Sequence, residues 1–486
     1  MGNTILLQDK FSAGVKQDLP RDQLPAGAVW YATDLLPNIN AKLRERGGYS
    51  NSASNIAASL STAGYIEGGI YAPFVAGAKN LPIDEDGNMF SIAAGSVTSL
   101  SAVGIVKQNP VFHRDRVIVF AAGGASAPKV YDGTTISALG GSPPTAIYST
   151  VFTDRTVAGN TLAQPQRLFF SAAGNPASWD TTNSYIDFTD PITGLASLRT
   201  AILVFSLGNT SRIRGYTPPT VAGGSGDFAV DDPLWDVGCS DARSIAYWND
   251  QVIFANGTGI HITDGAGQDD LTRRCGMKRY WQDTIMNGYT TSWTIVAGVI
   301  RDHYIVSVMN GATFKGAAVI DLRGQSWWPA TNFDFSSMWS QQGAVDELYA
   351  GRRGAAWVAS LASIFSPVAG VKNDGDGDAV AATLETPYYR GKPGKKSWKR
   401  LFLTHYLRDY ATDNPTVALS YITTPEATSY TSITGSLAEL SAEDRVRAPL
   451  DFSSQGVAFK FARSNAGDWQ MSSIEADVHT REQTRI

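Results

Sequence analysis

The sequence has little cysteine and no long apolar run. Cys239 and Cys275 are the only cysteines in 486 residues, they stand far apart and no CxxC pattern occurs, which excludes a disulfide framework. We expect both to be small, buried, apolar side chains. The longest apolar runs, such as residues 201–205, are far shorter than the roughly 20 residues that span a bilayer. No signal peptide is visible after Met1, so we expect a protein without a membrane span, made in a reducing cytoplasm.

Charge is also scarce. Asp, Glu, Lys and Arg make up 17% of the chain, against about 25% in an average soluble protein, and the formal net charge is −5. The chain therefore lacks the basic excess that is typical of nucleic-acid-binding proteins. Ala/Glu/Lys/Leu/Arg periodicity is missing, which argues against a helical bundle.

Glycine and aromatic residues are abundant instead. The chain has 47 Gly, 12 Trp, 19 Tyr and 20 Phe, which excludes a disordered protein. Together with frequent Thr, Ser and Val, this composition predicts many short strands joined by tight turns, and hence an all-β fold.

Hairpin patterns recur through the middle of the chain. The clearest copies lie at residues 115–133, 250–265 and 302–321, and weaker copies lie at 69–92, 154–171, 201–215 and 347–359. Their spacing of about 39–52 residues matches one four-stranded propeller blade. Residues 67–365 are therefore predicted to form a β-propeller of about seven blades. A β-sandwich built from independent hairpins is the alternative, but the even spacing favours the propeller.

The flanking regions differ from the repeats. Residues 1–66 are interrupted by proline and glycine and predict an extended N-terminal arm, with a short helix near 51–62. Residues 366–383 are rich in Asp and Gly and predict a linker. Alternating patterns in residues 384–486 predict half-buried antiparallel strands, and thus a C-terminal β-sandwich domain.

Catalytic and metal-binding motifs are missing from the sequence. No GxSxG element occurs, and no histidine stands at HExxH spacing. We therefore predict no catalytic residue, no metal site and no cofactor, and we do not expect an enzyme. The five histidines are expected to be ordinary residues: His113, His261, His303, His405 and His479.

An acidic run in the linker resembles part of a calcium loop. Asp374, Asp376 and Asp378 with Glu385 match four EF-hand positions, but Ala379 stands where the sharp turn needs glycine. A solvated linker is the favoured interpretation, and bound Ca²⁺ is the alternative.

One cluster of basic residues contains no acid. It could be a solvated face, an inter-subunit contact or a phosphate contact. Its members are Arg390, Lys392, Lys395, Lys396, Lys399 and Arg400.

Four groups of segments resemble a bacteriophage protein family. They are residues 11–15 with 24–27 and 44–49, residues 167–171 with 174–179, residues 237–245 leading to 250–265, and residues 455–480. These segments resemble the packaged-DNA stabilisation, head-closure and tail nozzle proteins of short-tailed bacteriophages. Gly47 departs from the pattern, which usually has proline there.

The resemblance implies a structural virion protein that is assembled in the host bacterial cytoplasm. Such a protein forms a homo-oligomeric ring, commonly a hexamer, in the tail or head-to-tail connector. The ring continues the DNA channel between portal or adaptor and tail proteins, helps to retain the genome, and passes double-stranded DNA at infection. We expect the arm and the C-terminal domain to contact neighbouring subunits, so that deleting residues 1–50 leaves the propeller folded but blocks assembly.

Receptor-glycan binding and glycoside hydrolysis are the alternatives to the structural virion role. A distal tail propeller that binds a receptor glycan would need exposed aromatic residues, for which Trp327 and Trp328 are candidates, although paired Trp more often packs between blades. A propeller glycoside hydrolase would need clustered acids at the central channel.

Overall fold

The computed structural model confirms the all-β class, with 54% strand and 4% helix. Among the described residues, no helix is long and apolar enough to cross a membrane. The expected helix near 51–62 and most of the expected linker lie outside the described residues. The structure describes residues 3–37, 40–46, 49–51, 64–93, 96–121, 127–340, 347–353, 358–365, 380–390, 396–407, 417–433, 445–463 and 469–480.

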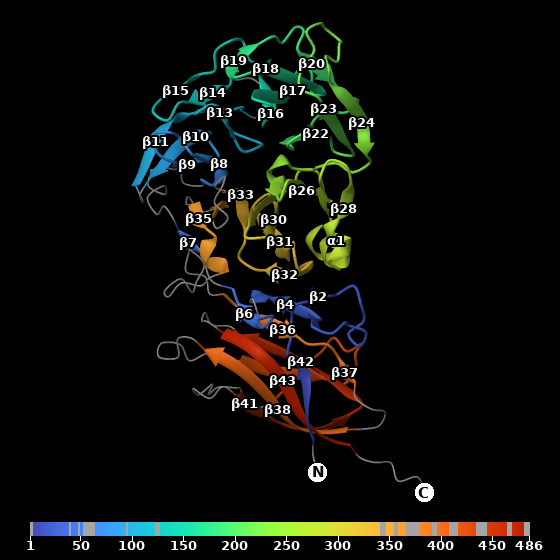
Figure 1. Ribbon diagram of the computed structural model, residues 1–486. Coiled ribbons are helices and arrows are strands. Elements are labelled where there is room, and N and C mark those ends of the chain that lie inside the picture. The colour runs from blue at the N-terminus through green and yellow to red at the C-terminus, as the bar shows by residue number, and fades with distance from the viewer. Residues whose placement is uncertain are drawn as a thin grey trace.

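Seven small antiparallel sheets, numbered here along the chain, follow one another in the described part of residues 50–360 (Figure 1). The first four are β8 (Ile66–Ala72), β9 (Lys79–Asp84), β10 (Asn88–Ala93) and β11 (Ser96–Ala102); β12 (Val111–Phe112), β13 (Val117–Val119), β14 (Lys129–Tyr131) and β15 (Ile136–Ala138); β16 (Ala146–Phe152), β17 (Arg155–Thr161), β18 (Arg167–Ala172) and β19 (Asn175–Trp179), with β20 (Tyr185–Asp187) also on β18; and β21 (Gly194–Ser197), β22 (Ala201–Phe205), β23 (Thr210–Arg214) and β24 (Ala229–Trp235).

In the remaining three sheets neighbouring strands again follow one another along the chain. The exception is the last strand of the seventh sheet, which comes from the N-terminal segment. These three sheets are β25 (Ala246–Trp248), β26 (Gln251–Asn256), β27 (Gly259–Thr263) and β28 (Gln268–Asp270); β29 (Thr294–Ile300), β30 (His303–Asn310), β31 (Thr313–Asp321) and β32 (Ser326–Ala330); and β33 (Phe335–Ser340), β34 (Leu348–Arg352), β35 (Val358–Ser360) and β7 (Ser50–Asn51). The short helical segments are η2 (Ala242–Ser244), α1 (Leu271–Arg274), η3 (Tyr280–Ile285) and η4 (Ala362–Ile364).

Tight turns explain why Asp recurs at the start of the sequence hairpins. In four sheets, two residues with positive φ join the first strand to the second, and the second of these residues is Asp115, Asp154, Asp250 or Asp302. A two-residue turn of this hand needs positive φ at both positions, which Asp tolerates better than most residues. The hairpins expected near residues 116, 155, 201, 251, 303 and 347 are therefore the second and third strands of their sheets.

The first strands of successive sheets contact each other. β8 contacts β12, β12 contacts β16, β16 contacts β21, and β25 contacts β29. The Ser197 amide at the end of β21 donates to the Tyr247 hydroxyl of β25 at 3.1 Å. β33 contacts both β29 and β8, so the seventh sheet returns to the first. This last approach is close, because a Cβ atom added at Gly69 of β8 would lie 2.6 Å from the Trp339 ring of β33.

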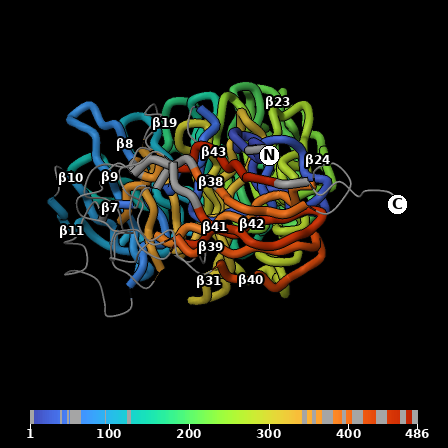
Figure 2. The backbone as a smooth tube through the Cα atoms, turned by 90° about the horizontal axis from the view of Figure 1, so that it is seen from below, coloured from blue at the N-terminus to red at the C-terminus, as the bar shows by residue number. Residues whose placement is uncertain are grey.

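The N-terminal segment pairs with the C-terminal strands. Two six-stranded sheets lie below the seven sheets in Figure 1, and Figure 2 shows them nearest the viewer, with the N-terminus beside β43. Tyr421 and Phe452 stack between them, with ring centroids 4.1 Å apart. One sheet has the order β41 (Arg445–Ser454), β38 (Lys396–Leu407), β43 (Trp469–Thr480), β6 (Leu43–Glu45) and β5 (Leu35–Pro37), with β1 (Asn3–Gln8) on β43; the other has β4 (Tyr31–Thr33), β36 (Thr383–Glu385), β42 (Gly456–Arg463), β39 (Val417–Ile422) and β40 (Thr431–Ser432), with β37 (Tyr389–Arg390) on β42.

Buried side chains join this lower part to the sheets above. The short strand β2 (Gly14–Val15) pairs in parallel with β3 (Ala28–Val29). Val15 of β2 and the nearby Phe11 belong to one apolar cluster with Trp327 of the sixth sheet and Leu401 of β38. Asp34 binds Arg46 at 2.6 Å and accepts from the Thr331 amide at 3.0 Å. The described strands of residues 1–51 therefore pair with strands of the same chain. Deleting residues 1–50 should consequently disrupt the C-terminal sheets as well as any assembly.

We predict that Phe11→Ala destabilises the fold by about 3–5 kcal/mol, because Phe11 is fully buried and its loss leaves a cavity. Leu6→Ala is the matched control in the same segment, since Leu6 is 58% exposed and its removal should cost within about 0.5 kcal/mol. Urea unfolding followed by circular dichroism measures both. Equal stability of the two variants would contradict the packing of this segment.

Candidate functional site at the centre of the seven sheets

A cavity of about 850 Å³ lies where the first strands of all seven sheets meet. It is lined mainly by the C-terminal halves of these strands, as at Ile70 of β8, Thr150 of β16 and Val299 of β29. The first strand of each of the seven sheets contributes lining residues, so these strands lie around one cavity.

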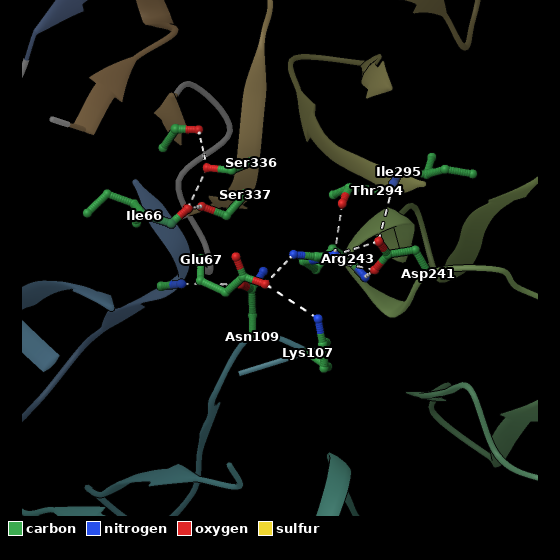
Figure 3. A network of polar contacts seen from close by, with 12 residues as sticks. Ile66, Glu67, Lys107, Asn109, Asp241, Arg243, Thr294, Ile295, Ser336 and Ser337 are labelled. Carbon is green, nitrogen blue, oxygen red and sulfur yellow. Dashed lines mark hydrogen bonds and ion pairs between the residues drawn. The ribbon is translucent and has the colours of Figure 1, made fainter. Parts of the chain in front are cut away.

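A polar network lies by the N-terminal ends of the same strands (Figure 3). At its centre is Arg243 of η2, which is 7% exposed. Its Nε and Nη2 atoms donate to the two carboxylate oxygens of Asp241, at 3.0 and 2.8 Å. Its Nη1 atom donates to Glu67 of β8 at 2.7 Å. The guanidinium therefore connects the first sheet to the segment between the fourth and fifth sheets.

Local backbone structure holds Asp241 in place. Asp241 caps η2, where its carboxylate accepts from the Arg243 amide at 3.0 Å, and it also accepts from the Ile295 amide of β29 at 3.2 Å. Burial opposes the charge of Arg243, but Asp241 and Glu67 outweigh it and raise the pKa of the guanidinium above its usual value. The network thus also reaches the sixth sheet and keeps its cation charged.

The segment before β12 crosses the same region. Asn109 donates to the Met338 carbonyl of β33 at 2.7 Å and accepts from the Gly69 amide of β8 at 3.2 Å. Gln108 donates to the Leu195 carbonyl of β21 at 2.7 Å. Two neighbouring amide side chains therefore tie the first, fourth and seventh sheets together.

These contacts suit mechanical locking better than proton transfer. Glu67 and Asp241 both bind the same guanidinium, so neither carboxylate is paired with the other as an acid and a base. Ser336 and Ser337 add hydrogen bonds to the Ile66 carbonyl at 2.6 and 2.7 Å. The chemistry that this arrangement supports is the cohesion of the sheets around one buried charge.

Three of the four described members of the predicted basic cluster contact acids of the same chain. Arg390 lies 2.7 Å from Asp22, Lys399 lies 2.9 Å from Asp451, and Arg400 lies 3.9 Å from Asp477. Lys396 is different, because its side chain is buried, burial lowers its pKa, and its amino group has no hydrogen-bond partner within the described part of the chain. Lys392 and Lys395 lie outside the described residues. A contact of this cluster with phosphate or a partner stays a prediction.

Trp327 and Trp328 are buried between the seven sheets and the lower part. Their exposed fractions are 0% and 1%, and the Trp327 ring lies 4.7 Å from that of Tyr280. Neither can be the exposed aromatic surface that glycan binding was expected to use.

The structure describes both cysteines, but not the three aspartates of the candidate calcium loop. Cys239 and Cys275 are buried and unpaired as expected, and burial raises the pKa of Cys239 to about 12. Asp374, Asp376 and Asp378 lie outside the described residues. Within the described ranges, no group of three His, Cys, Asp or Glu side chains could hold a metal ion.

The comparisons with known proteins give no family for the chain. No family model matches it, and no curated protein matches it. Similar solved structures include BBS1N in complex with ARL6DN, with 12% identity, a TM-score of 0.40, and coverage of 65% of this chain and 97% of that one. The computationally designed Ika8 protein has 12% identity, a TM-score of 0.38, and coverage of 62% and 96%. PorZ of Porphyromonas gingivalis has 9% identity, a TM-score of 0.38, and coverage of 69% and 43%.

Sequence reasoning missed the central network. Asp241 and Arg243 lie within one of the motifs that carry the phage resemblance, so a signal was present, although it did not indicate their contact. Glu67 stands 176 residues from Arg243 and follows no recognisable pattern. Spatial pairing over such a separation cannot be read from one sequence.

We predict that Arg243→Met lowers the free energy of unfolding by about 3–5 kcal/mol, because it removes the cation from Asp241 and leaves Glu67 with only the half-exposed Lys107, 3.8 Å away. Arg279→Met is the control, since Arg279 is 67% exposed and its ion pair with Asp283 should contribute less than about 1 kcal/mol. Chemical unfolding measures both. A near-neutral effect of Arg243→Met would show that the network does not hold the sheets.

We also predict a pH dependence from His261, a buried strand residue whose pKa is lowered by burial to about 4. Between pH 6.5 and 4 the unfolded chain binds a proton that the folded chain resists, so stability is full above pH 6.5 and falls as the pH drops. The loss should be on the order of 2–3 kcal/mol. His261→Gln should flatten this part of the stability profile, and an unchanged slope would refute the assignment.

Proposed function

We propose that the seven sheets form a closed seven-bladed β-propeller, and that the chain is a structural protein of a bacteriophage virion. Support for closure comes from the contacts of β33 with both β29 and β8, and from β7, which completes the seventh sheet with a strand from the other end of the repeat region. Support for the phage role comes from the sequence segments that resemble tail and head-closure proteins.

The observation that carries the structural role is the state of the central polar groups. Arg243 forms ion pairs with both Glu67 and Asp241, and Asn109 is hydrogen-bonded through both its donor and its acceptor atoms. A polar network committed to internal contacts stiffens the subunit, and a virion component under mechanical load needs such stiffness.

The volume of the central cavity limits where DNA could pass. A cavity of about 850 Å³ with a polar network at one end cannot pass a duplex. DNA would therefore run through the hole of a ring made of several copies, expected to be six, between the portal or adaptor and the tail. The net charge of −5 suits a conduit, because few phosphate contacts let the duplex slide.

The ring must close through heterologous contacts between copies. The described strands of residues 1–51 are paired within their own chain, so other surfaces must make the contacts between copies. An exposed apolar residue such as Val75, on the loop between β8 and β9, offers one such surface at 92% exposure.

We predict that disrupting the gene in the phage yields empty heads without a normal tail, seen by electron microscopy with DNA content assayed alongside. Complementation with the intact gene should restore full, tailed particles. Full particles with complete tails that fail to adsorb would instead favour receptor binding. Fully infectious particles would contradict the virion role.

A further inference from the structure

The central cavity has the form of a cup. Gln108 and Asn109 line it, and the Arg243 network lies near the N-terminal ends of the strands whose C-terminal halves form its wall. At the opposite end, exposed residues including Tyr247 and Asn249 form the rim. The volume of about 850 Å³ falls within the roughly 300–1,000 Å³ of small-molecule sites.

The wall of the cup contains hydroxyl groups without partners. Ser149 and Thr150 of β16 line the cavity, and each is only 4% exposed. Within the described residues neither hydroxyl makes a hydrogen bond, and neither is among the side-chain oxygens that are shut off from solvent. Gln108 also lines the cavity, but its unpartnered side-chain oxygen is closed off from solvent. These groups suit a ligand that both donates and accepts hydrogen bonds.

Aromatic rings line the cup near its rim, and hydrogen bonds fix two of them. The Tyr247 hydroxyl accepts from the Ser197 amide at 3.1 Å, while its side chain stays 51% exposed. The Trp248 indole donates to Asp302 at 2.9 Å. Tyr71 is held by stacking on Tyr349, with ring centroids 6.4 Å apart. Rings that are oriented beforehand lower the entropy cost of binding.

The charged side chains of the cup are already engaged. Asp302 binds Trp248 and also lies 3.0 Å from Arg323, and Arg301 interacts elsewhere in the chain. A charged ligand would therefore compete with existing ion pairs, whereas an uncharged polyhydroxylated ligand would not.

We propose that this cup binds a neutral oligosaccharide. The sugar's hydroxyl groups bond Ser149 and Thr150, and its C–H faces pack on Tyr247 and Trp248. This inference is independent of the proposed virion role, and it places glycan recognition at the centre of the seven sheets instead of at Trp327 and Trp328.

Saturation-transfer NMR and calorimetry on the full chain test the proposal with maltotriose, cellotriose, mannotriose and N-acetylchitotriose, and with the charged sugar sialyllactose. At least one neutral trisaccharide should bind. Tyr247→Ala should raise its Kd about tenfold, as expected for loss of one aromatic contact. Tyr216→Ala is the matched control, because Tyr216 is also exposed but lies outside the cup, and it should leave Kd unchanged.

Thr150→Val keeps the side-chain shape and should weaken binding without changing the circular dichroism spectrum. Absence of binding by every neutral sugar at millimolar concentration would overturn the proposal. Tighter binding of sialyllactose, or equal effects of Tyr247→Ala and Tyr216→Ala, would overturn it as well.

Discussion

A buried guanidinium between two carboxylates is the constraint on which the seven-sheet region depends. Removing Arg243, Glu67 and Asp241 from water is costly, and the cost is offset only where all their hydrogen bonds form together. That requirement selects one arrangement of the first sheet, the η2 segment and β29. Apolar packing would allow neighbouring sheets to shift slightly against each other. The directional hydrogen bonds of this network do not allow such a shift.

The two ends of the chain impose a second constraint. β7 completes the seventh sheet, while β1 and β6 join β43 near the C-terminus. The N-terminal segment therefore contributes strands to the seventh sheet and to both lower sheets, and so links these three sheets. Such pairing of distant segments is slow to form but hard to undo locally, which suits a subunit that must withstand load.

The sequence indicated the repeat but only part of each sheet. Hairpins with a leading Asp were visible because a tight turn and two apolar strands leave a local pattern, as at Asp250. The sequence does not identify the first and last strands of the second to seventh sheets, since pieces as short as β12 carry no periodicity. In the first sheet the pattern at 69–92 includes the first strand, β8, and the third, β10, but not the strand β9 between them. The N-terminal strands were interpreted as a free arm for the same reason. The basic cluster met acids as distant in sequence as Asp22, and no single-sequence argument could reveal those partners.

The most direct test of the account is a cryo-electron microscopy map of the virion at side-chain resolution. The account predicts a ring of copies of this chain around the duplex. Each copy should have seven blades closed around the Arg243 network, with no DNA density in its own centre. A map in which the chain is missing from the virion, or in which its seven sheets stay open between the first and the seventh, would contradict it.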